Sequence, residues 1–143
     1  MKLRFAVVAL FLVASSSCSG SKDDGVPTSP TAEVLFTINE CCHDNLFTAL
    51  TNRYVTTRNK VFELNAITLV TNAGTLVVTD VTTQVAWVNT TPTLLSLDSG
   101  TIPCTLRPSR RCKVVRILNV LGDGRVDGTW QGHLGDVRFN IAG

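Results

Sequence analysis

Cysteine is the residue type with the clearest chemical potential in this sequence. Five are present, at Cys18, at the adjacent positions Cys41 and Cys42, and at Cys104 and Cys112. Thiols either form disulfides or bind soft metal ions. Zinc sites favour two cysteines separated by two residues, and that spacing is absent, so a centre built on Cys41, Cys42 and His43 is not expected. We predict no metal and no cofactor.

Basic residues gather around the last two cysteines. Five cations fall within ten residues: Arg107, Arg110, Arg111, Lys113 and Arg116. Such a cluster is typical of a solvated loop, but it also fits an anion-binding tip for polysaccharide, a phosphate headgroup or an acidic protein. Both interpretations stand at the level of sequence.

Catalytic patterns are weak. The chain has two histidines, His43 and His133, and lacks the Gly-x-Ser-x-Gly motif of hydrolases. His43 is followed by Asp44, but adjacent residues rarely arrange as a base and its orienting partner. The glycines and aspartates of 122–128 lack the alternating ligands of a calcium loop. We therefore expect no catalytic residues and no enzyme activity.

The N-terminus predicts export. Lys2 and Arg4 precede an apolar run over residues 5–14, which is shorter than the ~20 residues that span a bilayer but suits a signal peptide over residues 1–17. Ser16, Ser17 and Cys18 then resemble the lipobox of bacterial lipoproteins, in which the cysteine receives lipid. Ser15 stands where that family usually has Leu or Val, which keeps ordinary cleavage near Ala14 as an alternative.

Residues 18–31 read as a tether between this anchor and a folded domain over 32–143. The stretch is rich in Gly, Ser, Pro and charge, and buries too little apolar surface to offset the entropy of ordering. The resemblance implies a membrane partner through lipid at Cys18 and a place in the bacterial cell envelope, at the outer membrane or cell surface. Without Lys2 and Arg4, eleven cations face eleven anions, so no nucleic-acid partner is expected.

Export to an oxidising compartment bears on the four remaining cysteines. An even number there favours disulfides. Bridging the neighbours Cys41 and Cys42 demands unusual geometry, so we expect each to pair with Cys104 or Cys112, with either of the two arrangements open. Two such bridges would staple the first strand to the basic loop.

From Ala32 the apolar pattern has a period of two, which indicates strands. We expect strands near 34–38, 61–70, 75–79, 84–89, 93–97, 113–121, 125–131 and 137–141, with a weak helical turn over 42–50. Turns are expected at 72–74, 98–100, 122–124 and 132–135, and Asp123-Gly124 suggests a hairpin. The predicted core consists of Val34, Phe36, Val78, Val85, Trp87, Leu97, Val137 and Phe139.

Residues 75–100 resemble the bacterial Ig-like (group 2) family. The matching features, in order, are Asp80-Val81-Thr82, Val85-Ala86-Trp87, Asn89 to Pro92, Leu97 and Gly100. The resemblance implies an all-β fold, an Ig-like β-sandwich, with about twenty residues around 104–122 intruding as an inserted hairpin.

The resemblance also implies a non-enzymatic module for adhesion, assembly or binding, with a polysaccharide or another envelope protein as partner. The alternative is a small-ligand or carbohydrate-binding β domain of unrelated topology that uses the basic loop 104–116. Strand order and a concave pocket lined by Trp130 and arginines would separate the two.

Overall fold

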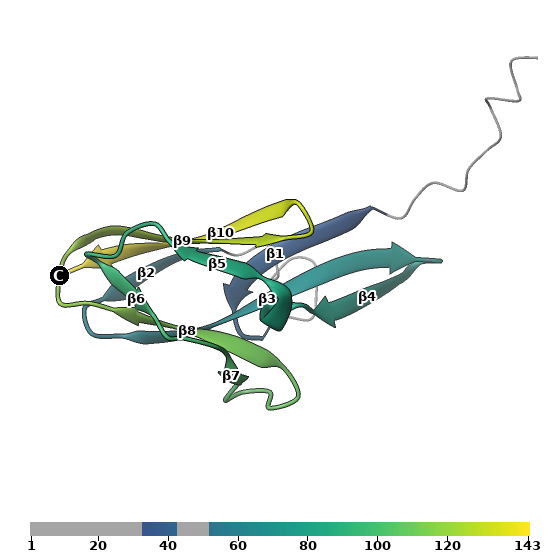
Figure 1. The fold of residues 1–143 in the computed structure, drawn as a ribbon, viewed down its shortest axis with the longest axis horizontal. Helices are drawn as coiled ribbons and strands as arrows, with labels where there is room; N and C mark the ends of the chain where they lie inside the picture. Colours follow the sequence, from purple (N-terminus) through teal and green to yellow (C-terminus); the bar gives the residue numbers. More distant parts are fainter. Residues whose placement is uncertain (1–32, 43–51) are drawn as a thin grey trace, which may run out of the picture. The chain divides into compact units, whose positions relative to one another are not determined.

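In the part of the chain that the structure describes, most residues lie in β-strands, which form two sheets (Figure 1). The computed structural model describes residues 33–42 and 52–143. One sheet contains β1 (Val34–Glu40), β3 (Val61–Asn72), β8 (Arg111–Ile117) and β6 (Leu95–Leu97) in that order, with β4 (Thr75–Asp80) on β3 and β7 (Ile102–Pro103) on β8. The other contains β2 (Arg53–Thr57), β10 (His133–Ala142), β9 (Gly122–Trp130) and β5 (Ala86–Asn89). A short 3-10 helix, η1 (Thr82–Gln84), precedes β5.

Seven of the ten described strands pair in the order found in an immunoglobulin-type sandwich. With β2, β4 and β7 set aside, the remaining strands can be lettered A to G in chain order. The first sheet then has the order A-B-E-D and the second has C-F-G, as in the constant-type immunoglobulin fold. The expected all-β sandwich is thus confirmed.

Apolar side chains from both sheets meet in one core. Its buried members include Ile38 of β1, Leu64 of β3, Val115 of β8, Val126 of β9 and Phe139 of β10. The interior therefore depends on one face of each sheet, as the period of two requires.

The predicted core is half right. Phe36, Val85, Val137 and Phe139 are buried. Trp87 and Leu97 are half-buried and pack against that core. Val34 is half-buried, and Val78 instead packs on a separate small cluster around Ile67 and Leu69.

One predicted turn is confirmed and another is wrong. Ala73 and Gly74 join β3 to β4 with φ of 47° and 79°, so both adopt the left-handed backbone of a tight hairpin turn. Asp123 and Gly124 form no hairpin and lie within β9. Gly124 is buried there, and a Cβ at that position would come within 2.9 Å of the Leu95 side chain. Close packing accounts for this glycine.

The inserted hairpin expected over 104–122 is not confirmed. Its strand β8 lies inside the first sheet, between β3 and β6, and Val115 is fully buried. β2, which the sequence did not suggest, pairs in parallel with β10. The predicted signal peptide, Cys18, the predicted tether, His43, Asp44 and all but the first residue of the helical turn predicted over 42–50 lie outside the described residues.

Candidate functional site

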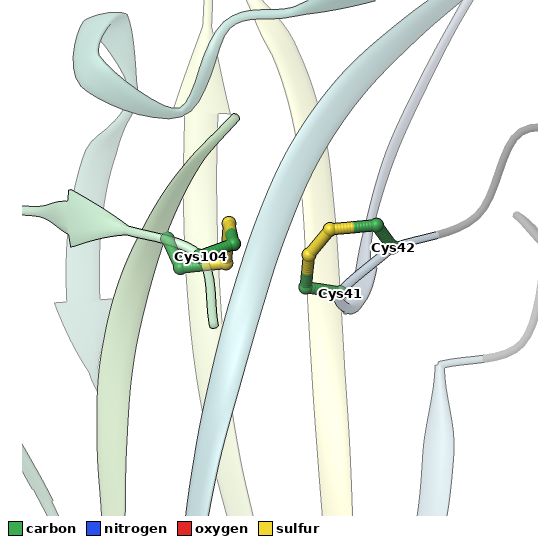
Figure 2. A group of neighbouring side chains, drawn as sticks. Cys41, Cys42 and Cys104 are labelled. Atoms are coloured by element: carbon green, nitrogen blue, oxygen red, sulfur yellow. A yellow bond between two sulfur atoms is a disulfide. The ribbon is translucent and has the colours of Figure 1, made fainter. Parts of the chain in front are cut away.

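The four cysteines of the domain lie together where the ends of three segments meet. Cys41 follows β1 and its N–H donates to the carbonyl of Glu63 in β3. Cys112 lies in β8, which also pairs with β3. The sulfur atoms of Cys41, Cys42, Cys104 and Cys112 all lie within 4.8 Å of one another. Figure 2 shows Cys41, Cys42 and Cys104 of this group as sticks.

The pairing differs from the expected cross-links. Cys104 is bonded to Cys112, with Cα atoms 5.1 Å apart, and Cys41 to Cys42. The prediction that Cys41 and Cys42 bridge to the basic loop is therefore wrong for this structure. The cause is local: β7 pairs with β8 and the Cys104 N–H donates to the Arg110 carbonyl, which closes the loop on itself.

Disulfide sulfurs are poor metal ligands because coordination requires thiolates. In the reduced form, four thiols at this separation have the donor set of a tetrahedral zinc site. The expectation of no metal rested on the absence of two cysteines separated by two residues. That criterion does not detect this arrangement, because an adjacent pair and a second pair distant in the sequence supply the four thiols. As disulfides, the four cysteines have structural roles: the Cys104–Cys112 bond closes the loop, and the Cys41–Cys42 pair follows β1 beside it.

The exposed end of the basic cluster is neutralised by an aspartate. Arg116 donates from Nε and Nη2 to the two carboxylate oxygens of Asp98, at 3.0 and 2.8 Å. These hydrogen bonds hold the pKa of the Asp98 carboxyl below its usual value. A two-point pair of this kind occupies the face of the guanidinium that an anionic ligand would use.

The central cations of the cluster donate to β3 and to the segment before β7. Arg111 donates to the hydroxyl and the carbonyl of Thr101, and Lys113 donates from Nζ to the Gly100 carbonyl at 3.1 Å. Lys113 is 9% exposed, and its burial lowers the pKa of the amine. Arg110 donates to Asn65 Oδ1 at 3.3 Å. Arg107 is exposed and has interactions of its own. The cations of the predicted anion-binding tip are thus all engaged by other groups of the protein.

A polar network explains the Asp80-Val81-Thr82 motif. Asp80 accepts the N–H and hydroxyl of Thr82 at 2.9 and 2.6 Å, the side-chain amide of Asn65 at 3.1 Å and the N–H of Arg111 at 2.6 Å. Asn65 and Thr82 are almost fully buried. Because a buried polar group is costly without a partner, this network fixes the start of β8 against β3 and η1.

A second group of cations arises from strand register. Arg138 of β10 lies opposite Arg53 of β2 on one side and opposite Arg125 of β9 on the other. Adjacent strands are ~4.8 Å apart, so the three residues form one row across the sheet, which we call the arginine row. Their neighbours Tyr54, Val126, Val137 and Phe139 pack in or against the core, so alternation places the arginines on the outer face.

Two aspartates orient this row from one side. Asp127 and Asp136 lie opposite each other one pleat away. Arg125 donates from Nε to Asp127 Oδ1 at 2.6 Å, and Arg138 donates from Nε to Asp136 Oδ2 at 2.7 Å. No described residue accepts from their Nη atoms, and Arg53 forms no ion pair with a residue in the described part of the chain. Each guanidinium has five N–H donors, so most remain available.

A groove of about 650 Å³ opens on the other side of the row. It is lined by Arg53, Arg125, Arg138, Asn140, Thr90 and Thr91 among others, while Asp127 and Asp136 are not part of the lining. Val55, which is 81% exposed, and Asp123, which accepts from Asn140 Nδ2 at 2.8 Å, complete its far end. The volume is within the ~300–1,000 Å³ range of small-ligand sites.

The lining matches part of the expected ligand pocket. It contains arginines and polar groups, but Trp130 lies elsewhere, stacked on His133 with ring centroids 5.8 Å apart. None of the three arginines was singled out by the sequence, because they are far apart along the chain. The sequence signal was the position of each arginine in an alternating strand. That signal identifies a common site only when the pairing register of the strands is known.

Scans against models of protein families, curated proteins and solved structures found no match for this chain. Within residues 33–42 and 52–143, no helix has the length and apolar character needed to cross a lipid bilayer.

Proposed function

We propose that this chain is a non-enzymatic Ig-like module of the bacterial cell envelope, anchored by lipid at Cys18, that serves adhesion, assembly or binding. The observation that carries the proposal is the strand order A-B-E-D over C-F-G. Sandwiches of this type present loops and sheet faces to partners from a rigid core, and their function resides in those surfaces.

The family resemblance gains support from the roles of its motif residues. Asp80 and Thr82 belong to the buried network, and Trp87 donates from Nε1 to the Thr82 carbonyl at 3.1 Å. Asn89 donates to the Leu95 carbonyl at 2.7 Å and accepts the N–H of Thr91 at 3.1 Å. The motif thus joins the two sheets at η1 and shapes the connection from β5 to β6. These structural roles agree with a family signature that carries no catalytic residues.

The anchor is tested by fractionation. Wild-type protein is expected in the detergent-soluble membrane fraction with an acylated Cys18, whereas Cys18→Ser is released or left unprocessed. A mature N-terminus at Ser15 or Ser16 without acyl mass, measured by mass spectrometry, contradicts lipidation and favours ordinary secretion.

The binding role is tested with the full mature protein in vesicles. Vesicles that carry it are mixed with isolated sacculi, outer-membrane vesicles or surface polysaccharide, and protein-free vesicles are the control. Saturable co-sedimentation with one of these materials is expected. Absence of binding to all of them contradicts a role in adhesion or assembly.

A second candidate, small-ligand or carbohydrate binding, is favoured by the groove beside the arginine row. The predicted site for this function was the basic loop 104–116. The ion pair of Arg116 with Asp98 and the contacts of Arg111 and Lys113 make that loop the poorer candidate.

A further inference from the structure

We propose that the groove beside the arginine row binds carboxylated or sulfated sugar units of an anionic polysaccharide. The inference rests on the binding role proposed above and names its ligand class. It uses residues of β2, β9 and β10 that the sequence did not connect.

The cationic side of the groove suits oxyanions. A guanidinium presents parallel N–H donors that match a carboxylate or sulfate. In Arg125 and Arg138 the Nε atoms are held by Asp127 and Asp136, which orients both forks without occupying the Nη donors. Arg53 extends the same row at the edge strand. Two of the three guanidinium groups are therefore pre-ordered, which lowers the entropic cost of binding.

The opposite side of the groove suits hydroxyl groups. Asn140, Asp123, Thr90 and Thr91 offer amide, carboxylate and hydroxyl groups, and the two threonine hydroxyls already bond to the Arg125 backbone. An acidic sugar unit carries hydroxyls and an acidic group on one ring, so a single unit can contact both sides of the groove. Counting Asp123, Asp127 and Asp136, the region has as many carboxylates as arginines. Recognition therefore depends on directed donors more than on net charge.

Other polyanions fit less well. Nucleic acid would require aromatic side chains for base stacking, and the aromatic residues of the lining are Tyr54 and Phe139, which pack into the interior. An acidic peptide would use apolar contacts for its other side chains, and Val55 is the one aliphatic side chain among the lining residues.

The experiment measures affinity by isothermal titration calorimetry on the mature protein in detergent. The probes are polygalacturonate, heparin, neutral dextran, poly-glutamate and a single-stranded DNA oligonucleotide. The variants are Arg53→Gln, Arg53→Lys and Arg138→Gln, with Arg58→Gln as the matched control, because Arg58 is exposed in the turn after β2 and does not line the groove. Melting curves verify that each variant folds.

Polygalacturonate or heparin is expected to bind, with dextran inactive. Arg53→Gln and Arg138→Gln should each weaken binding about tenfold, as loss of one charge-assisted contact implies, with Arg53→Lys intermediate and Arg58→Gln unchanged. The preference between polygalacturonate and heparin identifies the acidic group as carboxylate or sulfate.

Three results overturn the inference. Equal effects of the row variants and Arg58→Gln place the site elsewhere, although envelope binding then stands. Tighter binding of poly-glutamate or DNA than of either polysaccharide contradicts the ligand class. Binding to no polyanion removes the site altogether, while co-sedimentation with sacculi or vesicles still decides the wider function.

Discussion

Two regions of this domain each gather several cationic side chains, and the hydrogen bonds of those side chains differ between the two regions. In the disulfide-closed loop and β8, Arg116 is held by Asp98 from two nitrogens, and Arg111 and Lys113 donate to the backbone of the segment before β7. In the arginine row, Arg125 and Arg138 each donate from one nitrogen to an aspartate, and both line a groove.

The difference shows that density of charge along a chain is a poor guide to a binding surface. Cations crowded into ten residues find partners close by, here the Asp98 carboxylate and the carbonyl groups of Gly100 and Thr101 before β7. Three arginines from separate strands are brought together by register alone, and the outer face of a sheet leaves their donors toward solvent. We therefore propose that the first region serves stability and the second serves recognition.

The largest expected effect is on the network that holds the first region. Asp80→Ala removes the acceptor for Thr82, Asn65 and the Arg111 N–H, two of them buried. We expect a loss of about 3–4 kcal/mol in the free energy of unfolding, measured by chemical denaturation without reductant. Asp123→Ala, at an exposed carboxylate, is the control and should change stability by no more than about 0.5 kcal/mol. Equal effects of the two variants would show that the network contributes little.

The loop disulfide is next in size. Replacing Cys104 and Cys112 together by Ala opens a loop with a sequence separation of eight, for which the chain-entropy model gives about 2.5 kcal/mol. Affinity for polygalacturonate should remain that of the wild type, because the groove lies on the other sheet. A strong loss of affinity with retained fold would move the binding site to the loop and reverse our comparison.

Substitutions of single arginines should affect stability in the first region and anion binding in the second. Arg111→Ala loses the contacts to Thr101 and is expected to lower stability by about 1 kcal/mol without affecting anion binding. Arg53→Ala should leave stability within about 0.5 kcal/mol and weaken binding. Thermal melts and calorimetry on the two variants measure both quantities. Weakened binding in Arg111→Ala together with lowered stability in Arg53→Ala contradicts these roles.

The smallest effect concerns acid titration of Asp98. Its pKa is lowered by the hydrogen bond from Arg116, so the pair contributes stability above the unfolded pKa of ~3.9. That contribution is lost as pH falls through the lower folded pKa. Arg116→Gln should raise the pKa of the Asp98 carboxyl toward its usual value, as followed by NMR of the side-chain carbon. An unchanged titration would show that the pair does not persist in solution.

Much of the fold could be predicted from the sequence, and the reasons are local. Alternation in 61–70 and 137–141 identified β3 and β10, and Ala73-Gly74 has the residue types of a tight turn. β2 was not predicted, because Tyr54 is the one residue of its five whose apolar side chain packs against the core. Its parallel pairing with β10 joins segments some eighty residues apart, which no local pattern indicates.

The site was harder to predict because its residues meet only through pairing. The sequence favoured Arg107 to Arg116 on density, whereas hydrogen bonds to Asp98, Thr101 and Gly100 could be found only in the folded loop. The cysteine pairs were wrong for a related reason. The β7–β8 pairing places the Cα atoms of Cys104 and Cys112 5.1 Å apart, a proximity that the sequence pattern does not indicate.

Backbone NMR of the mature protein titrated with an oligogalacturonate tests the central claim most directly, because it reports on both regions at once. We predict saturable shifts of the amide signals of Arg53, Thr91, Arg125, Arg138 and Asn140, with the loop amides of 105–110 unchanged. Saturable shifts confined to 105–110, with a silent arginine row, would contradict the account.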